Sequence, residues 1–284
     1  METHLHYIGA NGNTIDMLHN GYFQTIHADG LTRLSANIAS STTPNVDGDR
    51  INNVWAQPRG IVLDLRIRGN VDVEEAKRYV LQTIKPTQTG RLVLTQGDRV
   101  LEIEGCVESI NMPRFGRGVT MQVSLHCSEP YWHDLENVLL EISRTIAMHY
   151  FPDAEGGLYI PAGGIVISAY DTNMTRTYTN DGDAACGMVI SIVALGAVQN
   201  PVIYMADGTY IGVNDSMIAG DEIIINTNAG QKGITKNGVN ILNRIRPGSK
   251  FFQLETGDNV LTIGSDGNTA GNVYFTLSFR RRFV

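Results

Sequence analysis

The stretch AGDEIIINTNAGQKGITKNGVNIL, residues 219–242, decides the fold class. Two β-branched runs, 223–225 and 234–235, flank a turn-rich segment, and the dipeptide Asn237-Gly238 follows directly. Asn-Gly is the strongest short signal for a β-hairpin, because both central residues of a type I′ turn have a positive φ. The stretch therefore predicts a meander of antiparallel strands. It contains no reactive residue, which is typical of a scaffold or a binding surface.

The second half of the chain repeats this rhythm. From residue 151 onward, ten short strand-like runs alternate with turns over about 130 residues, a density typical of a jelly roll or lectin-like sandwich. These runs include 156–161, 163–170, 187–195 and 250–255. We expect this half to be an all-β sandwich.

The first half mixes strands with one helix. Alternating apolar residues over 59–70 predict a half-buried strand, and 91–110 predicts a hairpin about Gly97-Asp98, followed by a strand over 118–127. Between them, Asp72 can cap a helix that ends before Pro86. Its apolar positions recur at helical spacing: Val73, Ala76, Val80 and Ile84. The chain is therefore predicted to be mainly β, with a β-barrel-like or α+β domain followed by the sandwich.

Length favours two domains, since 284 residues exceed what one core usually organises. We expect a domain over 1–134 and a second over 135–284, with the boundary near Trp132 to Leu135. The apolar residues of 135–150 fit one face of a helix, although a segment that joins two domains could also be partly extended.

Charge and cysteine content exclude several classes. The net charge is −7, with 12 basic and 15 acidic residues in 1–134 and 10 and 14 in 135–284, so neither half is a basic nucleic-acid module. No apolar run reaches the roughly 20 residues of a membrane helix, and no signal peptide opens the sequence. The three cysteines have no metal-ligand spacing, which favours buried thiols in a reducing compartment. We expect a soluble protein without nucleic-acid binding or membrane insertion.

Signals for catalysis and cofactors are weak. The sequence has no nucleophile elbow, dinucleotide fingerprint or Walker loop, and no pair of acids stands out for glycosidase chemistry, so we expect neither enzymatic activity nor a cofactor. His4 and His6 could present two imidazoles to a metal, but no further ligand pair accompanies them, which favours a packed or terminal role. The Asp-rich segments 47–49 and 181–183 could bind calcium, but the sequence favours a role of these Asp and Gly residues in forming turns.

A carbohydrate site would need aromatic platforms beside polar groups. Residues 135–284 contain no Trp, and the rings there stand at strand positions, which more often belong to a core. The rings that could offer a platform are Tyr170, Tyr178, Tyr204, Tyr210, Phe251 and Phe252. A stand-alone lectin-like module that binds carbohydrate therefore remains the alternative function.

The order of several short motifs resembles the distal tail protein family of long-tailed (siphovirus-type) bacteriophages. The motifs are SLHCSEPYWHD (124–134), YTNDGDA (178–184), AGDEIIINTNAGQKGITKNG (219–238) and FFQLETGDNVLTI (251–263). The resemblance runs from about Gly21 to Phe279. It implies a C-terminal galectin-like sandwich and an N-terminal domain that assembles as a hexameric ring at the tail tip.

The resemblance also implies a virion structural protein, made in the host bacterial cytoplasm. Such a ring would connect the tail tube protein to the baseplate and serve as a docking hub. Its partners would be a tail-associated hub or lysin protein and receptor-binding or baseplate proteins. Related hub proteins occur in contractile and non-contractile tails, so the resemblance leaves the tail type open.

The loop SSTTPNVDGDRINN (40–53) has the composition of a long exposed hairpin or loop. In a ring-forming protein, an extension of this kind would reach the adjacent subunit, whereas in a monomer it would be a mobile loop. We expect the subunit interface to include Pro44, Asp47, Gly48, Asp49, Arg50 and Arg59.

Overall fold

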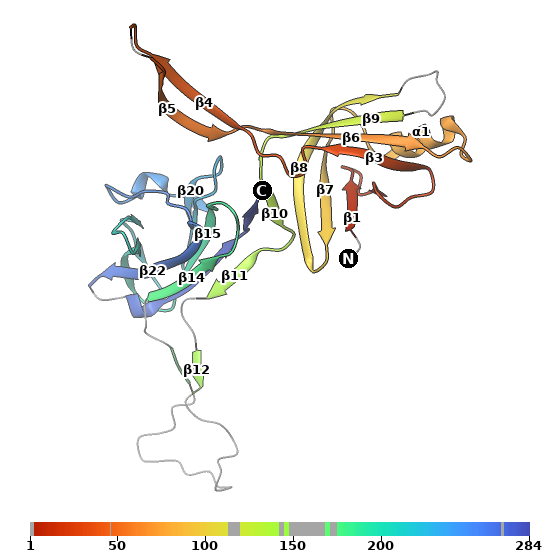
Figure 1. Ribbon diagram of the computed structural model, residues 1–284. Coiled ribbons are helices and arrows are strands. Elements are labelled where there is room, and N and C mark those ends of the chain that lie inside the picture. Colours follow the sequence, from red (N-terminus) through yellow and green to blue (C-terminus); the bar gives the residue numbers. More distant parts are fainter. Residues whose placement is uncertain are drawn as a thin grey trace, which may run out of the picture. The chain divides into compact units, whose positions relative to one another are not determined.

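Two compact units make up the computed structural model of the chain (Figure 1). The structure describes residues 3–45, 47–112, 120–141, 145–147, 168–170, 175–267 and 270–284. The N-terminal unit comprises 1–135 and 282–284, and the C-terminal unit comprises 136–281. The boundary expected from the sequence lay one residue earlier and placed 282–284 in the second domain. The prediction of a mainly β chain is confirmed, with one α-helix among the described residues.

The N-terminal unit contains most of the long strands. Its elements are β1 (Thr3–Ile8), β2 (Thr14–Asp16), β3 (Phe23–Asp29), β4 (Ala36–Thr42), β5 (Asp49–Ala56), β6 (Arg59–Ile67), α1 (Val73–Thr83), β7 (Thr89–Gln96), β8 (Arg99–Asn111), β9 (Thr120–Cys127), β10 (Trp132–Asp134) and β24 (Arg282–Phe283).

The C-terminal unit is built from shorter strands and two 3₁₀ turns. Its elements are β11 (Val138–Glu141), β12 (Thr145–Ala147), β13 (Ser168–Tyr170), β14 (Thr175–Asn180), β15 (Met188–Ala194), β16 (Val198–Met205), β17 (Tyr210–Gly212), β18 (Ser216–Met217), β19 (Glu222–Asn226), β20 (Gly233–Lys236), β21 (Val239–Asn240), η1 (Leu242–Arg244), β22 (Gly257–Asp266), η2 (Ala270–Asn272) and β23 (Val273–Phe279).

One antiparallel sheet organises the N-terminal unit. Seven strands run in the order β2-β1-β7-β8-β9-β6-β3, and β10 joins β24 to β8. In β6, residues 59, 61, 63, 65 and 67 are buried, which confirms the predicted alternation. The hairpin of β7 and β8 turns at Gly97, whose φ is 64°, as the sequence predicts.

The helix α1 forms where the sequence predicts it. The Asp72 side chain accepts hydrogen bonds from the backbone N–H of Glu74 and Glu75, which satisfies two donors that the first helical turn leaves open. Val80 and the following Ile84 are fully buried and join the core of the sheet. The helix therefore covers part of the sheet and closes this core.

Two antiparallel sheets share one core in the C-terminal unit. The first has the order β11-β23-β15-β19-β20-β21, and the second has the order β14-β22-β16-β17 with β18 on β16. Ile190 and Phe275 from the first sheet belong to the same buried cluster as Ile203 and Leu261 from the second. This arrangement is a β-sandwich.

The meander predicted for residues 219–242 is present. Strands β19 and β20 pair with Ile225 opposite Ile234, and the next turn joins Lys236 to Val239. Asn237 and Gly238 have φ values of 49° and 80°, as a type I′ turn requires.

Two secondary-structure expectations are wrong. The helix fitted to 135–150 is replaced, where the structure describes it, by the strands β11 and β12, because β11 pairs with β23 along the edge of a sheet. The run 250–255 forms no strand and makes only an isolated bridge between Leu254 and Cys186. The run 156–161 and most of 163–170 lie outside the described residues.

Of the helices that the structure describes, none has the length and apolar character needed to cross a membrane.

Candidate functional site

The strands β4 and β5 form a hairpin of their own, which we call the arm (residues 36–56). They pair antiparallel with each other, and among the described residues neither pairs with a third strand (Figure 1). An isolated two-stranded hairpin is at best marginally stable in water, and its free edges are available for pairing. The arm is therefore the part of the N-terminal unit that has most to gain from a partner.

A bulge gathers three exposed apolar side chains of the arm on one face, while Trp55, which is 48% exposed, lies on the other face opposite Asn37. Ile38 stands opposite Val54, and Ser40 stands opposite Ile51, because the register shifts between Ala39 and Ser40. Since alternate residues of a strand share a face, this shift brings Ile51 to the side of Ile38 and Val54. Without the bulge, Ile51 would point to the opposite side.

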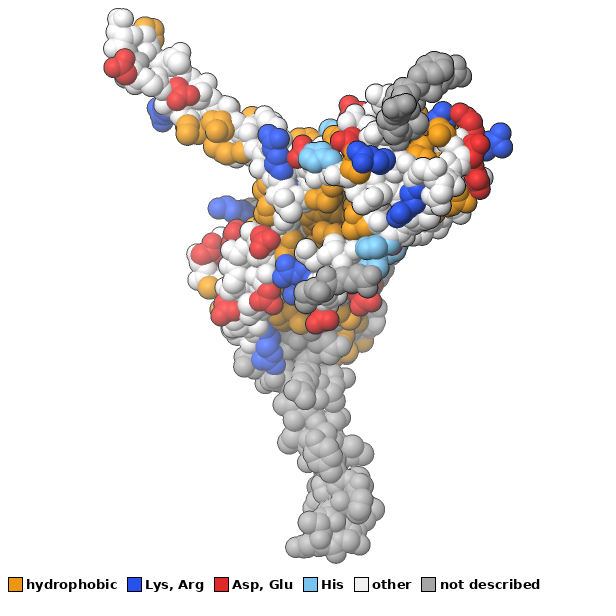
Figure 2. Space-filling view, turned by 45° about the vertical axis from the view of Figure 1, so that its right-hand side comes forward, with side chains coloured by type: hydrophobic (Ala, Val, Ile, Leu, Met, Phe, Trp, Pro, Cys, Tyr) orange, Lys and Arg blue, Asp and Glu red, His pale blue; other side chains and the backbone are white. Residues whose placement is uncertain are grey.

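The apolar face of the arm is exposed to solvent. The exposed fractions are 60% for Ile38, 59% for Ile51 and 52% for Val54. Figure 2 shows hydrophobic side chains uncovered along this hairpin. Large apolar groups rarely gather in the open on a monomer unless they mark a contact with another molecule.

Five of the six residues expected at an interface lie together at the tip of the arm. Pro44, Asp47 and Gly48 belong to the turn, and Asp49 and Arg50 begin β5. All five are exposed.

Arg59 lies elsewhere, in the buried interior of the N-terminal unit. It begins β6 with an exposed fraction of 3%, and its guanidinium donates hydrogen bonds to the carbonyl oxygens of Pro130 (2.7 Å), Leu31 (2.6 Å) and Gly30 (3.2 Å). Burial lowers the pKa of Arg59 below its ordinary value, and the neighbouring Cys127 partly offsets this effect. Arg59 therefore ties the segment that leads into the arm to the rest of the unit and is not part of the exposed surface.

Trp132 is a supporting residue that the sequence analysis missed. Its indole Nε1 donates to the carbonyl oxygen of Leu31 at 2.9 Å, the same oxygen that Arg59 contacts. The burial of Arg59 could have been predicted, because it shares the strand parity of Ile61 and Leu63. The contact with Trp132 depends on the tertiary fold and has no local signal.

The Asp-rich turn at 181–183 is organised by a neighbouring amide. The Asn180 side chain accepts from the N–H of Gly182 and donates to the carbonyl oxygens of Ala184 and Leu254. Asp181 lies 3.6 Å from the guanidinium of Arg281. Such hydrogen bonds are those of an Asx turn.

The aromatic residues of the sandwich divide between core and surface. Tyr178 is buried, and burial raises its pKa to about 12. Tyr204 and Tyr210 face each other across two strands with ring centroids 5.8 Å apart, and the Tyr210 hydroxyl donates to the carbonyl oxygen of Pro247. Phe251 and Phe252 pack against the core, and the Tyr170 side chain lies outside the described residues.

Comparison with family models finds a likeness in the C-terminal part of the chain. Residues 181–283 match the family described as siphovirus-type tail component, C-terminal domain. A search of curated proteins gives no match.

Solved structures extend the likeness to the whole chain. The SPP1 Dit (gp 19.1) protein, described as a paradigm of the hub adsorption apparatus in phages that infect Gram-positive bacteria, has a TM-score of 0.68 at 14% identity, with 100% of both chains covered. A chain of the phage P2 baseplate in its activated conformation with Ca has a TM-score of 0.47 at 14% identity, again with 100% of both chains covered. At this identity the first likeness establishes a shared fold. The resemblance to distal tail proteins is thus confirmed: residues 181–283 match the model of the siphovirus-type tail component C-terminal domain, and the whole chain shares the fold of the SPP1 Dit protein.

Proposed function

We propose that this protein is a distal tail protein that forms a hexameric ring at the tip of a phage tail. The observation that carries the proposal is the match of 181–283 to a tail-component family, together with the full-length fold shared with a Dit protein. In the virion, the ring connects the tail tube protein to the baseplate. It is the docking hub for a tail-associated hub or lysin protein and for receptor-binding or baseplate proteins.

The arm supplies the contact between neighbouring subunits in this proposal. Its apolar face, made by Ile38, Ile51 and Val54, packs against the next copy, and the tip residues 44–50 reach across to it. Repeated head-to-tail contact of this kind closes a cyclic assembly when the rotation between copies is one sixth of a turn.

The mass of the particle in solution tests the assembly. Light scattering behind a sizing column, over a range of protein concentrations, is expected to give six times the 31.1 kDa chain mass, about 187 kDa. A species of about 31 kDa at every concentration would count against a ring formed by this protein alone. Saturable binding of cell-wall polysaccharide by that monomer would favour the lectin-like alternative.

Substitutions on the two faces of the arm test the contact. We expect Ile38→Glu combined with Val54→Glu to dissociate the ring, because charged groups would be buried against the neighbouring copy. The matched control is Asn37→Glu with Asn53→Glu, which places the same charges on the opposite face of the same strands. Equal masses for the two double variants would refute a contact through the apolar face.

Deletion of 41–50 tests the tip. The shortened protein is expected to form smaller or weaker assemblies, while circular dichroism shows an intact fold. An unchanged oligomer would remove the tip from the interface.

A further inference from the structure

Three histidines and one aspartate meet at the edge of the N-terminal sheet. His4 and His6 lie on β1, whose even-numbered side chains point away from the core formed by Leu5 and Tyr7. His6 stands opposite Asp16 on β2, the last strand at this edge, and His19 follows in the turn after it. The histidine spacing alone indicates no further ligands beside His4 and His6, because Asp16 and His19 come close only through the pairing of β1 with β2 and the turn after it.

The Asp16 carboxylate is held in one orientation. Its Oδ1 accepts backbone N–H bonds from Leu18 (2.9 Å) and His19 (2.8 Å). Burial alone would raise the pKa of Asp16, but these bonds and the imidazoles of His4 and His6 outweigh it, and the pKa lies below its usual value. The two backbone bonds to Oδ1 therefore fix the carboxylate, with Oδ2 turned toward the histidines.

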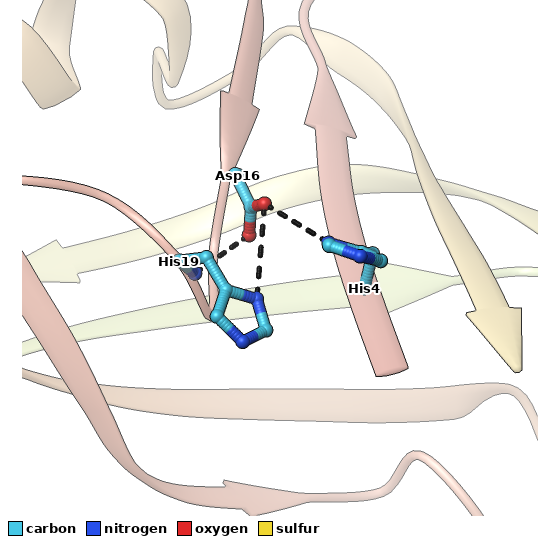
Figure 3. A group of neighbouring side chains, drawn as sticks. All are labelled: His4, Asp16 and His19. Atoms are coloured by element: carbon cyan, nitrogen blue, oxygen red, sulfur yellow. Dashed lines mark hydrogen bonds and ion pairs between the residues drawn. The ribbon is translucent and has the colours of Figure 1, made fainter. Parts of the chain in front are cut away.

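Asp16 Oδ2 lies within 3.9 Å of a ring nitrogen of each of the three histidines. The distances are 3.4 Å to His4 Nδ1 and 3.9 Å to His19 Nδ1 (Figure 3), and 3.6 Å to His6 Nε2. Good hydrogen bonds to oxygen are near 2.9 Å, so these contacts are long. Zinc–ligand bonds of about 2.0–2.1 Å in a tetrahedron place neighbouring ligand atoms about 3.3 Å apart, which is close to the 3.4 Å from Oδ2 to His4 Nδ1 and shorter than the 3.9 Å to His19 Nδ1.

We propose that His4 Nδ1, Asp16 Oδ2 and His19 Nδ1 form a Zn²⁺ site. These three atoms lie within 4.8 Å of one another, and two imidazoles with one carboxylate form a ligand set that suits zinc better than calcium. The His4 and His19 side chains are 33% and 50% exposed, which leaves an entry path for the ion. Bound zinc would fasten β1, β2 and the turn after β2 to one another.

Zinc titration of the full chain tests the site. The protein is purified without a polyhistidine tag, stripped with a chelator and titrated with Zn²⁺ in a calorimeter. We expect one ion per chain and a rise in the melting temperature of the N-terminal unit, since a ligand that binds only the folded state stabilises it. Cobalt in place of zinc is expected to give the visible spectrum of a tetrahedral site with nitrogen and oxygen ligands.

Paired variants separate this site from general binding to histidines and acids. His19→Gln and Asp16→Asn are each expected to weaken zinc binding at least about tenfold, because loss of even an indirect partner of a metal ligand costs about 10–100-fold. The matched controls are His27→Gln and Asp29→Asn on β3, both exposed and outside the cluster, and they should leave the affinity unchanged. Melting curves without zinc verify that each variant folds. Absence of saturable binding, or binding that His19→Gln and Asp16→Asn leave intact, would overturn the proposal.

Discussion

Asp221 secures the start of the meander through both of its carboxylate oxygens. Oδ1 accepts a hydrogen bond from the Asn237 side chain at 2.9 Å, and Oδ2 accepts from the N–H of Ile218 and pairs with Lys236 Nζ, each at 3.0 Å. The Asn237 bond first, then those from Ile218 and Lys236, lower the pKa of Asp221 from 3.8 to about 2. The strongest turn signal in the sequence is thus reinforced by an acid that the meander itself brings into place.

This pKa makes the stability of the sandwich depend on pH. A depressed carboxyl pKa stabilises the folded state above the unfolded value of 3.8, and this contribution is lost as the pH falls toward about 2. We therefore expect Asp221→Asn to lower the melting temperature of the C-terminal unit at pH 7 and to match the parent protein near pH 2. Melting curves between pH 2 and 7 measure the difference, and parallel curves throughout would contradict this role of Asp221.

The three thiols should differ in reactivity. Cys127 and Cys186 are buried, and burial raises the pKa of Cys127 to about 11, against a smaller opposite effect of Arg59, whereas Cys106 is partly exposed. Because the thiolate is the reactive form, we expect a disulfide reagent to modify one thiol rapidly in the native protein and three after denaturation. Cys106→Ser should abolish the rapid phase. Rapid modification of all three native thiols would contradict the described packing.

At the scale of elements, two glycines with the same backbone conformation should differ in their tolerance of a side chain. Gly30 follows β3 with φ +83°, and a Cβ there would lie 2.0 Å from the carbonyl oxygen of Gly60. Gly12, between β1 and β2, has φ +81°, and no atom lies within 4 Å of a Cβ placed on it. We expect Gly12→Ala to cost about 1 kcal/mol of unfolding free energy from its left-handed backbone. Gly30→Ala should cost about 2–4 kcal/mol, because overpacking adds to that strain.

Denaturant unfolding of the N-terminal unit compares the two variants. Each is measured against the parent protein at the same concentration, so that assembly contributes equally. Similar losses for Gly12→Ala and Gly30→Ala would show that the segment at Gly60 moves aside at little cost.

Elements with local signals could be predicted from the sequence, and those that depend on distant partners could not. Asp72 and the apolar spacing after it define α1, and Asn237-Gly238 defines a hairpin, because caps and turns act within a few residues. The strand β11 has apolar spacing that also fits a helix, and only its pairing with β23 makes it extended. The same limit applies to the proposed zinc ligands, since the pairing of β2 with β1 brings Asp16 to His4.

At the scale of the whole molecule, the chain returns to its first unit at its C-terminal end. In β24, Phe283 pairs with Trp132 and Arg282 pairs with His133. Phe283 is 3% exposed, with the guanidinium of Arg99 4.7 Å from its ring centroid, and Arg282 forms an ion pair of 2.9 Å with Glu129. The three residues 282–284 therefore belong energetically to a unit whose other residues end at 135.

Loss of the packing of β24 should lower the stability of the N-terminal unit only. We expect Phe283→Ala to cost that unit about 3–5 kcal/mol, the range for a buried Phe replaced by Ala, and to leave the unfolding of the sandwich unchanged. The two tryptophans of the chain, Trp55 and Trp132, both lie in the N-terminal unit, so tryptophan fluorescence follows its unfolding alone. Calorimetry of the same samples records both units. Val284→Ala, at a position that is 45% exposed, is the matched control and should change neither transition. A shift of the sandwich transition by Phe283→Ala, or an unshifted fluorescence transition, would contradict the assignment of β24 to the N-terminal core.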